Sequence, residues 1–152
     1  MAHPNCGLYK TTKAFQNIEA GRLVYFHNHG NPGAGVYLPK SWANNVATFH
    51  EQGTTLEDES YSNTLIALLP EGLYVVERAF TCCDKNCRTY EKDALVQLGY
   101  NGEAAAILFV PTLGASGMKI PTQGTKIDAS NFQNLRGLKV ARDKLEAGKT
   151  IH

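Results

Sequence analysis

The sequence has no excess of charge of either sign, and this argues against nucleic acid as a partner. Its 15 Lys and Arg residues are balanced by 14 Asp and Glu residues, which leaves a formal net charge of +1. Surfaces that bind phosphate backbones are strongly basic, because neutralising phosphates and releasing their counterions drives the binding. We therefore expect partners other than nucleic acid.

Long apolar runs are also missing from the sequence. No stretch approaches the roughly 18 to 20 apolar residues that span a bilayer, and the N-terminal segment lacks the basic and apolar regions of a signal peptide. We therefore expect no membrane association and a cytoplasmic location. In that compartment the four cysteines would be reduced thiols, metal ligands or core residues rather than a disulfide framework.

Recognisable catalytic and nucleotide-binding motifs are missing too. The glycine-rich stretch 30–35 is followed by no helix signal and by no Lys-Ser or Lys-Thr pair, so it predicts a hairpin loop rather than a phosphate-binding loop. The cysteines also lack the second CxxC-like pair of a zinc finger. The sequence therefore favours a binding or structural module over an enzyme.

What the sequence does contain is an internal repeat. Three short blocks recur in the same order: Gly-Leu-Tyr at 7–9 and 72–74, Leu-Val at 23–24 and 95–96, and Gln-Gly-Thr at 52–54 and 123–125. The alternative is that two strand-rich segments share only their turn residues. We predict one unit of about 65 residues used twice, with units at 1–71 and 72–142 and a tail at 143–152.

Each unit is predicted to consist of short strands joined by tight turns. The predicted elements are hairpin strands at 23–29 and 36–39, their copies at 95–100 and 106–111, a helical turn at 128–132, a last strand at 138–141 and a short helix at 141–147. The Gln-Gly-Thr blocks are predicted to form turns in which glycine is free to take a positive φ. Five strands per unit predict an all-β fold of two fused, SH3-like barrels, with a single two-sheet sandwich as the alternative.

The second unit carries an insertion that the first unit lacks. Seven residues, 16–22, lead to the first hairpin strand of unit one, whereas 14 residues, 81–94, lead to its copy. The longer segment contains Cys82, Cys83 and Cys87. Because the shared topology does not need the insertion, this loop is the first candidate for function.

His27 and His29 are the second difference between the copies, since Gly99 and Asn101 stand at the matching positions. Residues at i and i+2 of a strand point to the same face, so both imidazoles can reach one ion. If the inserted loop folds back, Cys82, Cys83 and Cys87 would join His27 and His29 around one zinc or iron ion. The simpler interpretation is buried apolar cysteines and hydrogen-bonded histidines at a strand end.

Three functions remain open from the sequence. The leading hypothesis is a non-enzymatic module that contacts a protein, or a second copy of itself, through its copy-specific loops, with Asn31, Pro32, Tyr37 and Trp42 as contact residues. Trp42, the only tryptophan, either caps a core or is exposed together with Tyr37. The alternatives are the metal-binding protein or metalloenzyme described above and a thiol redox protein that uses the three inserted cysteines.

Overall fold

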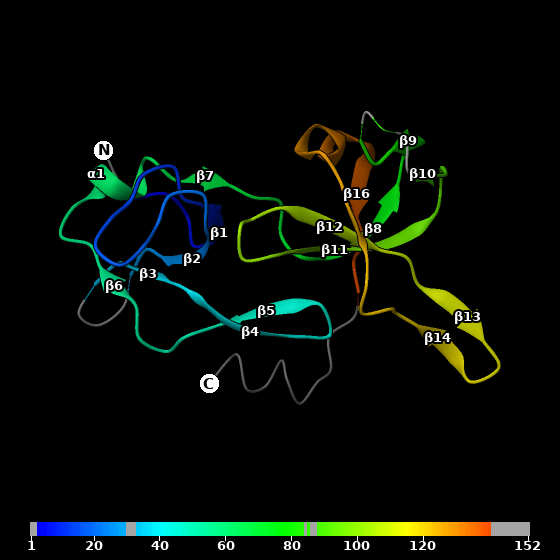
Figure 1. Cartoon of the computed structure of the whole chain (residues 1–152), viewed down its shortest axis with the longest axis horizontal. Helices are drawn as coiled ribbons and strands as arrows, with labels where there is room; N and C mark the ends of the chain where they lie inside the picture. Colours follow the sequence, from blue (N-terminus) through cyan, green and yellow to red (C-terminus); the bar gives the residue numbers. More distant parts are fainter. Residues whose placement is uncertain (1–2, 30–32, 84, 86–87, 141–152) are drawn as a thin grey trace.

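The protein is mainly β and contains several antiparallel sheets (Figure 1). The computed structural model describes residues 3–29, 33–83, 85 and 88–140. Two five-stranded sheets and three two-stranded hairpins make up its strand structure in these residues. Within the same residues, no helix has the length and apolar character needed to cross a membrane.

The first large sheet uses only strands from the N-terminal half of the chain. They are β1 (Gly7–Lys10), β2 (Leu23–His27), β3 (Gly35–Tyr37), β6 (Thr54–Thr55) and β7 (Ile66–Ala67). Their order is β6-β3-β2-β1-β7, and every neighbouring pair is antiparallel. The short helix α1 (Glu59–Ser62) connects β6 with β7, and the Asp58 side chain caps it by accepting from Ser60 N.

The second large sheet repeats this arrangement with later strands. They are β8 (Gly72–Val76), β11 (Leu95–Tyr100), β12 (Ala106–Phe109), β15 (Thr125–Lys126) and β16 (Leu135–Gly137). Their order is β15-β12-β11-β8-β16, so each strand occupies the place of its counterpart in the first sheet. The 3-10 helix η1 (Ala129–Asn134) connects β15 with β16 as α1 connects β6 with β7.

Three hairpins lie outside the large sheets. They are β4 (Pro39–Ala43) with β5 (Val46–Phe49), β9 (Phe80–Thr81) with β10 (Thr89–Tyr90), and β13 (Thr112–Gly114) with β14 (Gly117–Lys119). The β9–β10 hairpin is formed by the insertion in the second half. The first half has only a tight turn there, in which Phe15 and Ile18 exchange backbone hydrogen bonds.

The hairpin strands and the helical turn agree with the sequence prediction, but two predicted elements need comment. The last strand is β16, which begins at Leu135 rather than at 138. The extended C-cap at Leu135 ends η1 and lets the chain pair at once with β8. The predicted helix at 141–147 lies outside the described residues.

The predicted closed barrels are wrong, because each large sheet is open in the part of the chain that the structure describes. The end strands β6 and β7 of the first sheet each pair with one neighbour, as do β15 and β16 of the second. Three of these four strands contain only two residues. A strand count in the sequence cannot show closure, since closure depends on strand tilt and stagger.

Two clusters of buried side chains form the core. The first cluster fills one side of the first sheet with residues such as Val24, Phe26 and Val36. The second cluster is larger and is centred on β8, β11 and β12. It also contains Leu23 and Ala47 from the first half, so the second core is completed by residues that precede it in the chain.

The β4–β5 hairpin packs against the second sheet and joins the two halves. Trp42 Nε1 donates a hydrogen bond to the backbone oxygen of Tyr100 at 2.7 Å, and Asn45 Nδ2 donates to Gln97 Oε1 at 2.9 Å. Trp42 therefore neither caps a core nor stands free: it remains 42% exposed while its indole N–H is bonded across the halves.

Gly53 and Gly124 do not use the positive φ that glycine allows. The structure gives a different reason for a glycine at each of these positions. A Cβ atom on Gly53 would lie 2.5 Å from the backbone oxygen of Val36, and one on Gly124 would lie 2.5 Å from that of Leu108. The Gln-Gly-Thr segments thus require glycine because they pass very close to a neighbouring strand.

Glu71 is a half-buried carboxyl at the junction of the two halves. Its Oε2 accepts a hydrogen bond from Ala47 N at 3.0 Å, and burial raises the pKa of its carboxyl above the ordinary value of 4.5, partly offset by that bond. The folded state then holds a proton that the unfolded state releases, so stability should fall as the pH rises from 4.5 through the raised pKa.

We expect Glu71→Gln to remove this part of the pH dependence, since glutamine keeps the acceptor for Ala47 N and carries no charge. Urea unfolding of both proteins across the range from about pH 4 to pH 8 measures it. The two free energies should converge at the acidic end and diverge in favour of Glu71→Gln toward neutral pH. Parallel curves would contradict the prediction.

Candidate metal centre

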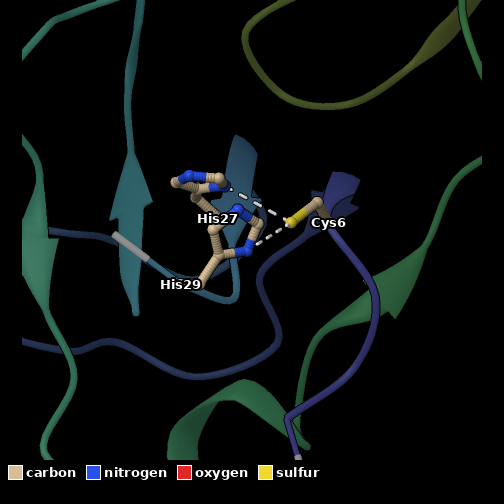
Figure 2. Close-up of side chains that lie close together, drawn as sticks. All are labelled: Cys6, His27 and His29. Carbon is tan, nitrogen blue, oxygen red and sulfur yellow. Dashed lines mark hydrogen bonds between the residues drawn. The ribbon is translucent and has the colours of Figure 1, made fainter. Parts of the chain in front are cut away.

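Cys6, His27 and His29 are brought together at the end of the first sheet, as Figure 2 shows. Each offers one ligand atom, and these atoms all lie within 4.8 Å of one another. Among the described residues, this is the group of three His, Cys, Asp or Glu side chains whose ligand atoms lie close enough together to hold a single ion. Cys6 and His27 are half-buried and His29 is exposed.

The register of the first two strands produces the cluster. Strands β1 and β2 pair with Gly7 opposite Phe26, and one more step along both strands places Cys6 opposite His27. The chain then bends after β2, so that the His29 ring lies 4.0 Å from the His27 ring between centroids. A cross-strand pair and a bend are therefore enough to gather three ligands from two segments.

The distances between the ligand atoms suit a tetrahedral ion. Cys6 Sγ lies 3.3 Å from His27 Nδ1 and 3.9 Å from His29 Nδ1. Zinc bonds of about 2.3 Å to sulfur and about 2.0 Å to nitrogen, at a tetrahedral angle, separate the two ligand atoms by about 3.5 Å. The observed separations lie on either side of this value.

Asn28 contacts the sulfur of Cys6 and the imidazole of His29. Its backbone N–H donates to Cys6 Sγ at 3.3 Å, and its Oδ1 lies 3.2 Å from the same sulfur and 2.7 Å from His29 Nδ1. Its Nδ2 donates to Pro4 O at 3.1 Å and so ties the segment before β1 to the end of β2. Asn28 Oδ1 contacts the same sulfur and ring nitrogen that would bind the ion, so these two contacts would give way to metal bonds. The backbone and Nδ2 contacts can remain and hold the segment in place.

Two hollows adjoin the cluster and keep it accessible. Cys6 lines one of about 450 Å³ together with Tyr25, Phe49 and Glu71, and His27 lines another of about 250 Å³ that also contains Tyr25 and Phe49. Burial, and to a smaller extent the negative charge of a Cys6 thiolate, raises the pKa of Tyr25. Cys6 and His27 therefore each border a hollow, and the two hollows share Tyr25 and Phe49.

The structure does not bring Cys82 or Cys83 to the histidine pair as the sequence analysis expected. Cys82 is 1% exposed and belongs to the second core, where its neighbours include Phe80 and Tyr90. Its sulfur lies 3.5 Å from that of Cys83, too far for a disulfide bond. The β9–β10 hairpin packs on its own half, so the simpler interpretation holds for Cys82. Cys87 lies outside the described residues.

The structure describes two of the four predicted contact residues, Tyr37 and Trp42. Tyr37 is half-buried and lines the hollow beside His27, and Trp42 contacts the second sheet as described above. Asn31 and Pro32 lie outside the described residues.

Sequence reasoning missed Cys6, although a signal for it exists. Cys6 precedes the first Gly-Leu-Tyr block, and Glu71 precedes the second. Cys6 therefore differs from the residue at the matching position just as His27 and His29 do. A comparison that includes the residues flanking each block would have found all three ligands.

In comparisons with protein-family models, curated proteins and solved structures, nothing matches this chain. The function proposed below therefore rests on the geometry of the cluster of Cys6, His27 and His29.

Proposed function

We propose that this chain is a metal-binding module whose first sheet holds one zinc or iron ion through Cys6, His27 and His29. The observation that carries the proposal is the placement of one sulfur and two imidazole nitrogens within 4.8 Å of one another. The three side chains come from two segments 21 to 23 residues apart in the chain. The residues at the matching positions, Glu71, Gly99 and Asn101, do not offer the same ligands.

The types of ligand favour zinc among the divalent ions. Thiolate and imidazole select borderline and soft metals, whereas Mg²⁺ and Ca²⁺ prefer oxygen ligands. Three protein ligands leave the fourth position of a tetrahedral ion to water or to Asn28 Oδ1, which lies beside both Cys6 and His29. We therefore expect a site that is open to exchange with solvent.

Titration of chelator-treated protein with Zn²⁺ tests the proposal. We expect one zinc per chain by elemental analysis and a rise of roughly 5 to 10 °C in the thermal midpoint at a large excess of ligand over its dissociation constant. EDTA should reverse the rise, and Mg²⁺ should not produce it. A protein that retains no zinc after desalting, with an unchanged midpoint, would overturn the proposal.

We further propose that the two sheets descend from one unit copied in tandem, with units at 1–71 and 72–142. Their identical strand order supports this. So do two hydrogen bonds of 2.6 Å at the same place in each half, from Tyr9 OH to Asn5 O and from Tyr74 OH to Pro70 O. The close approach at Gly53 recurs at Gly124.

The interaction module predicted from the sequence is a second candidate function. The observation that favours it is the exposed apolar surface of the β13–β14 hairpin, where Leu113 is 85% exposed. The thiol redox function and the cytoplasmic location stay predictions.

A further inference from the structure

The β13–β14 hairpin presents apolar side chains to solvent. Leu113 is 85% exposed, Met118 is 51% exposed and Ile120, just after β14, is 36% exposed. Figure 1 shows the hairpin projecting from the second sheet, on the side away from the first sheet. A group of exposed apolar residues on one projecting element is typical of a contact surface.

The register of this hairpin matches that of β4–β5. Leu113 pairs with Met118 and Gly114 with Gly117; in the earlier hairpin Trp42 pairs with Ala47 and Ala43 with Val46. Both hairpins therefore turn through two residues, and both follow the third strand of a large sheet. Leu113 occupies the position of Trp42, and Met118 that of Ala47.

In the first half, these positions make the contact between the halves. Trp42 donates to Tyr100 O, and the backbone N–H of Ala47 donates to Glu71. The Ala47 side chain is buried in the second core. Trp42 also lines a hollow of about 300 Å³ together with Phe109 of β12. The second hairpin also carries apolar groups at these places, Leu113 for Trp42 and Met118 for Ala47. In the residues that the structure describes, no third large sheet is present to receive them.

The first sheet offers a surface that corresponds to the one covered by β4–β5. Gln97 pairs with Phe109 in the second sheet, as Tyr25 pairs with Tyr37 in the first. Gln97 is buried and bonded to the Asn44 backbone in the hairpin, through Nε2 to the carbonyl oxygen at 3.0 Å. Tyr25 and Tyr37 are half-buried and line an open hollow of about 250 Å³.

We propose that the β13–β14 hairpin of one chain docks on the first sheet of a second copy, with Leu113 against Tyr37. The contact resembles the one that β4–β5 makes inside the chain, but it must pass farther from β2, because His27 stands at the place of Gly99, where a Cβ atom would lie 2.7 Å from Asn45 O. The inference rests on the proposed tandem relation, which equates the two hairpins and the two sheets. Such a contact joins two different surfaces, so it is head-to-tail and can close into a ring or extend as a chain.

Sedimentation of the full chain in EDTA tests the proposal without involving the metal site. We expect the average mass to rise with concentration between about 10 μM and about 1 mM, the range for small transient interfaces. Leu113→Asp should raise the dissociation constant by at least about tenfold, because docking would bury an unpaired carboxylate. The Leu113 side chain is exposed, so the variant should fold. Ile66→Asp, at an exposed apolar residue of β7, should associate like the wild type.

Mixing two variants tests the direction of the contact. Leu113→Asp keeps an intact receiving sheet, and Tyr37→Asp keeps an intact hairpin. Each alone should stay monomeric, whereas their mixture should form a 1:1 dimer that grows no further. A wild type that stays monomeric throughout, or a Leu113→Asp variant that associates as well as the wild type, would overturn the proposal. Loss of zinc binding with self-association retained would contradict only the metal site.

Discussion

Replacing His27 with alanine should weaken zinc binding by at least about a hundredfold, since loss of supporting contacts alone costs tenfold to a hundredfold and this change removes a ligand. The same loss is expected for Cys6→Ala. Each change leaves only two ligands, one of them the exposed His29, and such a pair competes poorly with water for the ion. Competition with a chromophoric chelator measures the affinity of each variant.

Cobalt distinguishes the role of each side chain in this site. Co²⁺ bound to thiolate gives a sulfur-to-metal charge-transfer band, which should vanish in Cys6→Ala and persist, at higher metal concentration, in His27→Ala. His50→Ala is the matched control, because His50 lines the same hollow as His27 but lies outside the ligand group. Full zinc affinity in His27→Ala would contradict the site.

The variant Cys83→Ser tests whether zinc binds at Cys6, His27 and His29 or at the inserted loop. We expect the variant to bind zinc like the wild type, because the described ligands all lie in the first half. Loss of zinc in Cys83→Ser with zinc retained in Cys6→Ala would instead support the loop as the metal site.

Gly53→Ala and Gly124→Ala should each destabilise the fold by about 1 to 3 kcal/mol. The added Cβ would lie 2.5 Å from a backbone oxygen in both cases and would also meet the ring of Tyr37 or Phe109 within 3 Å. A backbone oxygen in a paired strand cannot move away cheaply, so the strands must separate locally. Urea unfolding gives the free energies.

Gly102→Ala is the control for these two variants. Its nearest neighbours would be Arg22 Nη2 at 3.5 Å and Trp42 Cη2 at 3.9 Å, which are ordinary contacts with side chains. We expect a change well below that of Gly53→Ala, within about 1 kcal/mol. Equal losses in Gly53→Ala and Gly124→Ala would support the tandem relation. If Gly53→Ala and Gly124→Ala were as stable as the wild type, the close approach would be wrong.

Much of the local structure could be predicted from the sequence. The hairpin strands at 95–100 and 106–111 appear as β11 and β12, and the helical turn after Asp128 appears as η1. Alternating apolar residues and turn-forming glycine and asparagine carry this information within a few residues. Gly53 shows the limit of such predictions. The position requires glycine because it passes close to a strand about 17 residues away in the sequence, and a local pattern does not show that contact.

The candidate site was predicted only in part. His27 and His29 were found because they are two residues apart on one strand, which is a local pattern. Cys6 was missed because it meets His27 through the pairing of β1 with β2, across 21 residues of chain. Cys82 was misplaced for the same reason, since its packing in the second core depends on how its hairpin docks.

The sequence by itself determined the short strands, their turns and the recurrence of the same blocks in both halves, because these follow from neighbouring residues and from a comparison of the chain with itself. Only the tertiary structure decided three things: that the sheets stay open, that Cys6 joins the histidines, and that β4–β5 packs against the second sheet while the apolar residues of β13–β14 are exposed. Each of these depends on strand register and on docking between distant segments, and neither is encoded in any short stretch of residues.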